Sequence, residues 1–336
     1  MAYAITDTST AGDAVIYTDY DIAATLESGQ TFAFINERPV SAGAVDTRPV
    51  SAGAVDTRPV SAGAVDTHPV YAGAVDTHPV YAAAADTHPV YAGAVDARPV
   101  LIGGDHGAYE IMCRAPDKAF WTQYFDLGRS YERILSPFLG NAFLAECVKA
   151  FGGLRLLRQP VWETVCSFII SANNSINNIQ AIYKRLSYRF GDAVNWAGRT
   201  FYAFPSPDRL AAVGEEGLRT AKLGYRAPYL LETAQAIAAD GLPDLDGMGY
   251  DQALKYLRGL KGVGEKVADC VLLFSTRHQN ALPVDVWIER ALHDYYGMSG
   301  SRHAMKLDAQ NYFGDAAGIA QQFLFHGIRS NIKMER

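Results

Sequence analysis

The sequence contains 336 residues, of which 49% are hydrophobic and 20% charged, which is enough for two domains or one large one with a well-filled core. No apolar stretch is long enough to span a membrane, and the N-terminal residues lack a basic segment followed by an apolar core, so we expect neither a membrane protein nor an export signal. The four cysteines are scattered without metal-ligand spacing, which favours reduced thiols in a cytosolic protein.

Charge is distributed unevenly along the chain. The net charge is −6, which is unfavourable for a nucleic-acid-binding protein. Residues 1–150 carry nine basic against 18 acidic residues, whereas residues 151–336 carry 21 against 18. An anionic partner is therefore expected on the second half, where backbone N–H groups would have to supply part of the phosphate contacts.

The N-terminal region has the pattern of a small antiparallel sheet. We predict short strands at residues 15–20, 22–26 and 108–113. Between them, residues 27–34 predict a turn at Gly29 followed by a strand.

Residues 38–97 form a tandem repeat with a period of ten and the pattern (R/H)PV(S/Y)AGAVDT. A proline in every copy prevents a continuous helix and removes sheet hydrogen bonds. We therefore expect a flexible or loosely turned excursion, and a stack of short hairpins that turn at the AGA triplet is the alternative. The repeat histidines, at ten-residue spacing without other ligands, do not predict a metal site.

Helices are predicted for most of the second half. The aromatic segment 119–127 is expected to pack against them, and residues 129–135 predict a short helix. A helix is expected from Ser136-Pro137 to about residue 151, followed by a pair of helices within residues 154–190.

The most informative stretch lies between residues 251 and 296. Helices are predicted at 251–258 and 265–274, joined by a turn at Gly262, Val263 and Gly264 whose N–H groups can bind a phosphate. Lys266 lies in the first turn of the second helix, where a cation opposes the helix dipole, which indicates a nucleophilic amine. Asp285 is expected to cap a third helix reaching about residue 296, and its carboxylate could stabilise positive charge at a sugar carbon.

The segments GVGEKVADC and PVDVW in this stretch resemble the 8-oxoguanine DNA glycosylase/AP lyase branch of the helix-hairpin-helix (HhH-GPD) superfamily. Four further segments resemble the same family: SGQTF at 28–32, RLLRQ at 155–159, KLGYRAPY at 222–229 and AGIAQQFLF at 317–325. The resemblance covers nearly the whole chain except the repeat. The iron–sulfur cysteines of some related glycosylases are absent, so no such cluster is expected.

The resemblance implies an α+β fold. A small N-terminal antiparallel β domain, residues 1–135, would be interrupted by the repeat at 38–97. An all-helical, two-lobed body, residues 136–336, would contain the helix-hairpin-helix motif at 251–274 and a C-terminal pocket helix at 316–328.

The resemblance also implies a role for each matching residue. Lys266 would attack the deoxyribose C1′ of a flipped 8-oxoguanine, Asp285 would stabilise the oxocarbenium-like state, and β-elimination could nick the strand. Burial and nearby positive charge are expected to lower the pKa of Lys266. The other implied contacts are Gly29, Cys270, Gln321 and Phe325 with the base, and Asn173, Tyr225, Arg226, Gly262, Val263, Gly264 and Trp287 with the DNA.

Two positions depart from the family pattern. Asn178 stands where well-known members have an arginine that reads the cytosine opposite the lesion, so strict selectivity for that cytosine is in doubt. Trp287 stands where histidine is frequent near a phosphate.

The implied partner is double-stranded DNA containing oxidised guanine, bound by a monomer in the cytoplasm, at the nucleoid or in the nucleus. No cofactor or resident metal is expected, although a monovalent or divalent cation could bind the hairpin backbone. Two alternatives remain: a glycosylase for another lesion such as alkylated purines, and a non-catalytic DNA-binding module that uses the hairpin alone. Activity on a panel of damaged bases would distinguish 8-oxoguanine excision from the first alternative. An assay of base release would distinguish an enzyme from the second.

Overall fold

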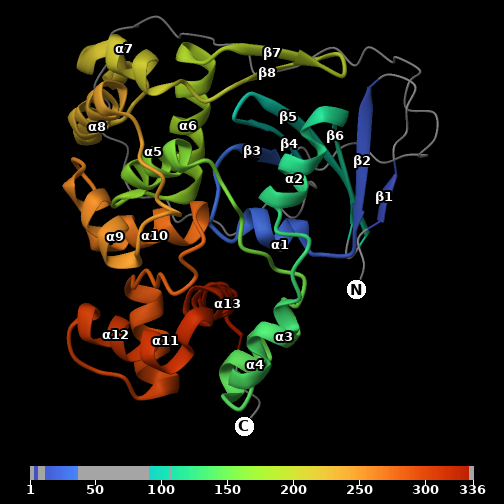
Figure 1. Ribbon diagram of the computed structural model, residues 1–336, viewed down its shortest axis with the longest axis vertical. Coiled ribbons are helices and arrows are strands. Elements are labelled where there is room, and N and C mark those ends of the chain that lie inside the picture. Colours follow the sequence, from blue (N-terminus) through green and yellow to red (C-terminus); the bar gives the residue numbers. More distant parts are fainter. Residues whose placement is uncertain (1–3, 7–11, 37–90, 106–107, 333–336) are drawn as a thin grey trace, which may run out of the picture.

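The computed structural model describes residues 4–6, 12–36, 91–105 and 108–332. Within them a sheet stands beside a helical body, as Figure 1 shows. The sheet has six antiparallel strands in the order β1-β2-β6-β5-β4-β3. Their bounds are β1 Ala4–Thr6, β2 Asp13–Thr18, β3 Phe34–Asn36, β4 Tyr91–Val95, β5 Arg98–Asp105 and β6 Ala108–Arg114. The predicted strands at 15–20 and 108–113 are thus confirmed within one or two residues at their ends.

The third predicted strand is instead a helix, α1 (Ile22–Glu27). The Asp21 carboxylate accepts a hydrogen bond from Ala24 N at 2.8 Å and starts a helical turn. Ile22 and Leu26, four residues apart, then lie on one helix face and enter the core beneath the sheet. The prediction was wrong because a short apolar run does not distinguish a strand from a capped helix.

The aromatic segment also lies elsewhere than expected. It forms α2 (Lys118–Tyr124), which packs mainly on the sheet rather than against the helices. Trp121 and Tyr124 are fully buried there and surround Phe34 of β3, with ring centroids 6.4 and 6.1 Å away. These three rings belong to the core of the sheet domain, whereas Tyr131 already belongs to the core of the helical body.

The last repeat copy supplies a strand of the sheet. Its residues Tyr91–Val95 form β4, and Asp96 and Ala97, with φ of 48° and 56°, turn the chain into β5. Positive φ at both positions is the geometry of a type I′ hairpin turn. In this copy the AGA triplet is therefore extended, and the turn falls on Asp96-Ala97. The conformation predicted for the other copies lies outside the described residues.

Eleven helices and a small two-stranded sheet form the described helical body. Their bounds are α3 Tyr131–Leu135, α4 Ala142–Ala150, α5 Val161–Ser171, α6 Ile176–Phe190, β7 Ala193–Trp196, β8 Arg199–Tyr202, α7 Pro207–Thr220, α8 Ala227–Asp240, α9 Tyr250–Gly259, α10 Glu265–Ser275, α11 Val286–Tyr296, α12 Arg302–Phe313 and α13 Ala317–Arg329. Two separate buried clusters, one centred on α10, α11 and α13 and one on α6, α7 and α8, make the body two-lobed.

Most predicted helices are confirmed, but the helix predicted to start at Ser136 begins later. A single 3-10 turn occupies Ser136–Phe138, and α4 begins only after Asn141, whose side chain accepts from Leu144 N at 3.0 Å. The Asn141 cap therefore replaces the cap predicted at Ser136. No helix in the described part of the chain has the length and apolar character needed to cross a bilayer.

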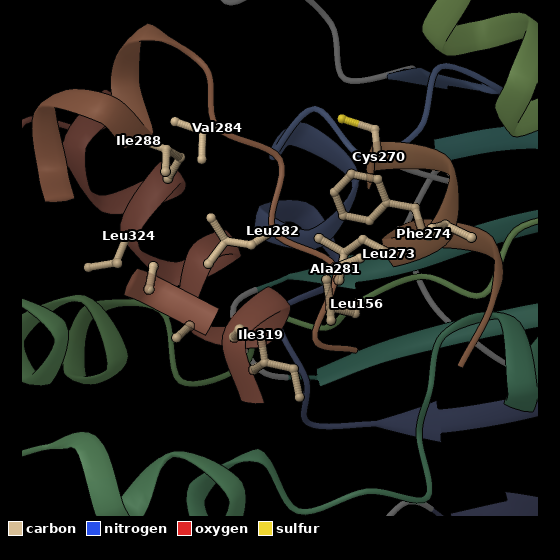
Figure 2. Packing of buried hydrophobic residues seen from close by; sticks show 14 of the residues in the cluster. Leu156, Cys270, Leu273, Phe274, Ala281, Leu282, Val284, Ile288, Ile319 and Leu324 are labelled. Carbon is tan, nitrogen blue, oxygen red and sulfur yellow. The ribbon is translucent and has the colours of Figure 1, made fainter. Parts of the chain in front are cut away.

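Helix α10 is held in the centre of the body by its apolar face. Figure 2 shows Leu273 and Phe274 of α10 in one core with Leu282 and Val284 of the segment that leads to α11, and with Ile319 and Leu324 of α13. This packing joins the hairpin, the Asp285 segment and the C-terminal helix. It thereby fixes the positions of side chains that come from three distant parts of the sequence.

Candidate active site and DNA-contacting loops

The turn between α9 and α10 requires glycine at Gly262. Its φ is +79°, and a Cβ there would lie 2.8 Å from Tyr229 Cβ. The turn is anchored by Val263, which is buried, and by Thr233 of α8, whose hydroxyl donates to Lys261 O at 3.0 Å. Among the described residues no side chain caps α10 at Gly264. The N–H groups of its first turn therefore face outward, as a phosphate site requires.

Lys266 lies at this helix start and is exposed to solvent. Its Nζ lies 5.5 Å from the centre of the Phe168 ring, and its ammonium is within hydrogen-bonding reach of the Cys270 sulfur one turn along. The pKa of Lys266 is raised, because Cys270 and then Asp285 favour the ammonium more than desolvation disfavours it. The predicted lowering is therefore wrong, since the neighbours of the amine are a thiol and a carboxylate rather than cations.

Cys270 is buried, and burial raises the pKa of its thiol to about 11, so it is a neutral thiol near pH 7. Figure 2 shows it on the α10 surface beside Phe274.

Asp285 caps α11, as predicted. Its Oδ1 accepts from Trp287 N at 2.9 Å and Ile288 N at 3.0 Å. Both bonds use the same oxygen, so Oδ2 is not committed to the cap. The carboxylate is close enough to Lys266 to raise the pKa of the amine. Lys266, Cys270 and Asp285 thus form one electrostatic cluster.

A buried ionic network behind α10 was not found from the sequence. Asp269, one turn from Lys266, pairs with Lys306 Nζ of α12 at 2.6 Å and accepts from the Tyr250 hydroxyl at 2.5 Å. Lys306 also donates to Glu265 at 3.0 Å. Burial raises the pKa of Asp269 to about 6, although the Lys306 ammonium opposes that rise. The acidic residues at 265 and 269 share a helix face, but nothing local indicates a cation from α12.

Three of the four predicted base-contacting residues, Gly29, Gln321 and Phe325, lie on or beside the C-terminal helix α13, whereas Cys270 lies on α10. Gly29 has φ of +81°, and a Cβ on it would lie 3.7 Å from Phe325 Cε1 and 3.8 Å from Arg329 Nη1. The Gln322 side chain donates to Ser28 O at 3.2 Å, which fixes this turn to α13. Gln321 is 4% exposed, and its Oε1 has no hydrogen-bond partner among the described residues.

Two loops form a second predicted contact region. Asn173 is exposed with a φ of 49°, at the turn between α5 and α6. Arg226 donates to Ala172 O at 2.9 Å and to Asn173 O at 3.0 Å, and the Tyr225 hydroxyl donates to Ala172 O at 3.1 Å. Tyr225 is half-exposed, but Arg226 is only 7% exposed. In the DNA-free protein Arg226 therefore supports the Asn173 loop instead of presenting a free guanidinium.

Comparison with known proteins identifies the family. The model described as "8-oxoguanine DNA glycosylase, N-terminal domain" matches residues 14–165, and that of the "HhH-GPD superfamily base excision DNA repair protein" matches residues 166–312. A "Probable N-glycosylase/DNA lyase" from Methanothermobacter thermautotrophicus is 35% identical over 63% of this chain and 75% of its own length. The chain belongs to the 8-oxoguanine DNA glycosylase/lyase family of the HhH-GPD superfamily.

Solved structures of similar proteins agree with this membership. MBOgg1, in complex with a low-affinity DNA ligand, is 27% identical with a TM-score of 0.77, over 99% of this chain and 100% of that one. The Clostridium acetobutylicum 8-oxoguanine glycosylase/lyase, bound to DNA with cytosine opposite 8-oxoguanine, shares the fold with a TM-score of 0.76 at 24% identity over 98% of each chain.

Both departures from the family pattern lie on the surface of this family member. Asn178 is exposed at the start of α6, where its Nδ2 donates to Asn174 Oδ1 at 2.8 Å. Trp287 is 38% exposed, and the Arg290 guanidinium lies 5.4 Å from its ring centre. An open cavity of about 310 Å³ adjoins Val286 and Arg290; neither Lys266 nor Gln321 lines it.

Proposed function

We propose that this family member excises 8-oxoguanine from duplex DNA in base-excision repair and can then nick the strand. The observation that carries the proposal is the cluster of Lys266, Cys270 and Asp285 at the end of the hairpin, in a chain that belongs to the glycosylase/lyase family. The hairpin N–H groups and the exposed Trp287 would hold the backbone, while Asn173 and Tyr225 would enter the space left by the flipped nucleotide.

Lys266 is the proposed nucleophile. Its neutral amine attacks C1′, the N-glycosidic bond breaks, and the base leaves with the bonding electrons and gains a proton. The nitrogen then loses one proton, its lone pair breaks the C1′–O4′ bond, and O4′ takes up a proton, which leaves a protonated Schiff base. Removal of a C2′ proton from this Schiff base expels the 3′ phosphate. Asp285 stabilises the positive charge that develops on the sugar. The ammonium of the resting enzyme must first lose a proton, so base release is expected to accelerate as pH rises.

The base site accounts for lesion choice. 8-Oxoguanine carries a proton on N7 where guanine has a lone pair, so a Gly29 carbonyl aimed at N7 attracts one base and repels the other. The unpaired Oε1 of Gln321 would accept from the pairing edge of the base. Phe325 would stack on one face of the base, and Cys270 would cover the other.

The proposed enzyme needs no cofactor, because an amine and a carboxylate supply the chemistry. It would act as a monomer on chromosomal DNA, in a nucleoid or a nucleus.

Borohydride trapping tests the proposal. An 8-oxoguanine duplex incubated with the protein and borohydride should give a covalent adduct through reduction of the Schiff base, and Lys266→Gln should abolish it. Lys261→Gln is the matched control, because Lys261 is an exposed lysine of the same turn that pairs with Glu232 at 3.7 Å. An adduct that persists in Lys266→Gln would refute the assignment. Release of alkylated purines but not 8-oxoguanine would favour a different lesion, and binding without base release would favour a non-catalytic module.

A further inference from the structure

Three residues of α13 form a row beside the Gly29 turn. Gln321, Phe325 and Arg329 follow at intervals of four residues and so lie along one face of the helix. The first two were expected from the sequence to contact the base. Arg329, the third, has no role in the reaction described above.

Arg329 lies at the same corner as the predicted base contacts. Its guanidinium carbon is 5.3 Å from the centre of the Phe325 ring, and its Nη1 would lie 3.8 Å from a Cβ on Gly29. A guanidinium over an aromatic face is attracted by the ring and loses part of its freedom before any ligand binds. The side chain is therefore held beside the site and is not spread into solvent.

Burial decreases along the row. Gln321 is 4% exposed and has its unpaired Oε1 inside, Phe325 is half-buried, and Arg329 is exposed. The inner end of the row thus offers an amide without a partner, and the outer end offers a cation. A nucleotide has the matching order, with an uncharged base that can enter and an anionic backbone that must stay near the surface.

Within the described ranges the charge of Arg329 is also without a carboxylate partner. Some exposed arginines of the body are paired, such as Arg219 with Glu215 and Arg302 with Glu289. Among the described residues no carboxylate forms an ion pair with Arg329, whose guanidinium lies over the Phe325 ring. A forked donor without a hydrogen-bond acceptor in the described part of the chain favours an oxygen acceptor that arrives with a ligand.

We propose that Arg329 is a further substrate-contacting residue, whose guanidinium donates hydrogen bonds to an acceptor oxygen of the flipped nucleotide at the outer end of the base site. This inference rests on the proposed function. The acceptor is a phosphate oxygen or a carbonyl oxygen of the base, and both offer the same chemistry to a guanidinium. If the acceptor is a phosphate, Arg329 would be one of the basic residues of the second half that bind the DNA backbone.

Equilibrium binding of Arg329→Gln tests this contact. The probes are three duplexes: one with 8-oxoguanine, one with a tetrahydrofuran abasic analogue, and one undamaged, all measured in a Lys266→Gln background so that no bond is cleaved. Arg302→Gln is the control, since it removes an exposed arginine that is already paired with Glu289. Thermal melting of each variant records whether the fold is intact.

A contact to phosphate should weaken binding of both modified duplexes by about tenfold and lower the slope of log Kd against log salt by about 0.9, the value for one phosphate. A contact to the base should weaken only the 8-oxoguanine duplex. In either case Arg329→Lys should recover part of the loss, and Arg302→Gln should resemble the parent. Unchanged binding, or an equal loss on undamaged DNA, would overturn the inference.

The two proposals fail differently. A parent protein that neither prefers nor excises 8-oxoguanine would refute the proposed function, whatever Arg329 does. A parent that excises 8-oxoguanine, with Arg329→Gln binding all three duplexes as the parent does, would refute only the inference about Arg329.

Discussion

Lys306 of α12 and Asp269 of α10 form a buried ion pair, 2.6 Å from Nζ to Oδ2, one helical turn from Lys266. Lys306 also reaches Glu265, so a single ammonium holds the buried Asp269 and the partly exposed Glu265 of α10. The first turn of α10 is thereby fixed to α12 from behind. Glu265 directly precedes Lys266 and Asp269 follows it by about one turn, so the two bonds of Lys306 fix the backbone that carries Lys266.

Lys306→Met should therefore destabilise the protein strongly. It leaves the Asp269 carboxyl buried without its cation, a change that typically costs about 3–5 kcal/mol. The free energy of unfolding in urea measures the effect. Lys261→Met, at an exposed ion pair, should change stability by less than about 1 kcal/mol. A double replacement, Asp269→Leu with Lys306→Met, should be more stable than Lys306→Met alone, and a double variant that is less stable would contradict this account.

Asp285→Asn should separate chemistry from folding. Asparagine is as good a helix cap as aspartate, so α11 and DNA binding should be preserved. Base release in a single turnover should slow by orders of magnitude, because the charge that stabilises the oxocarbenium-like state is lost. Unchanged turnover would remove Asp285 from the mechanism.

The pH dependence of the same variant gives an independent check. In the parent protein the amine of Lys266 is a minor species, because its pKa is raised above the usual value, so the rate should increase about tenfold per pH unit between roughly pH 6 and 9. Asp285 is one of the groups that raise this pKa, so the residual activity of Asp285→Asn should reach its plateau at lower pH. A pH-independent rate in the parent would show that deprotonation of Lys266 does not limit base release.

Phe325→Ala should weaken binding of the 8-oxoguanine duplex. Loss of one base-stacking surface corresponds to about 1–3 kcal/mol. Binding to undamaged duplex should stay the same, since Phe325 belongs to the base site. Equal lesion affinity of the parent and the variant would exclude stacking at this position.

Asn178 should make the enzyme tolerant of the base opposite the lesion. Its side-chain amide donates a hydrogen bond to Asn174, and asparagine has no guanidinium that could recognise the edge of the opposite cytosine. We expect excision rates opposite cytosine, adenine and thymine to differ less than in members of the family with arginine there, and Asn178→Arg to increase the preference for cytosine. Excision confined to lesion:cytosine pairs in the parent would disprove this.

Two deletions test the tandem repeat. Removal of residues 38–87 keeps the last copy, which forms β4, and should leave the melting temperature within a few degrees and excision nearly unchanged. Removal of residues 48–97 keeps the first copy instead. Ser41 then takes the position of Tyr91, and the hydrogen bond from the Tyr91 hydroxyl to Glu27 is lost. This deletion should also fold and excise, but with a slightly lower melting temperature.

A contact of the turn after β4 should be kept in both deletions. Asp96 N donates to Glu163 of α5 at 2.8 Å, and the first copy preserves an aspartate, Asp46, at the equivalent position. Loss of folding in both deletions, or of excision with folding retained, would show that the removed copies are part of the working enzyme. The sequence also leads us to predict that those copies loop away from the DNA face, and they lie outside the described residues.

The sequence by itself determined the features that depend on a few neighbouring residues. The hairpin helices, the glycine turn and the Asp285 cap were predicted at nearly their observed bounds, since spacing, capping and positive φ act within about one helical turn. The same local rules failed at residues 22–26, where five apolar and small residues fit a strand and a helix equally well, and the Asp21 cap decided for the helix.

Only the tertiary structure decided which distant groups meet. It placed Lys306 against Asp269 and directed the Arg226 side chain toward the loop that contains Asn173. It also brought Arg329 close to Gly29, which lies three hundred residues earlier in the chain. It also reversed the expected pKa shift of Lys266, because that pKa depends on which charges surround the amine in space. Such encounters follow from the packing of α10, α12 and α13 in one core, and no local pattern in the sequence records them.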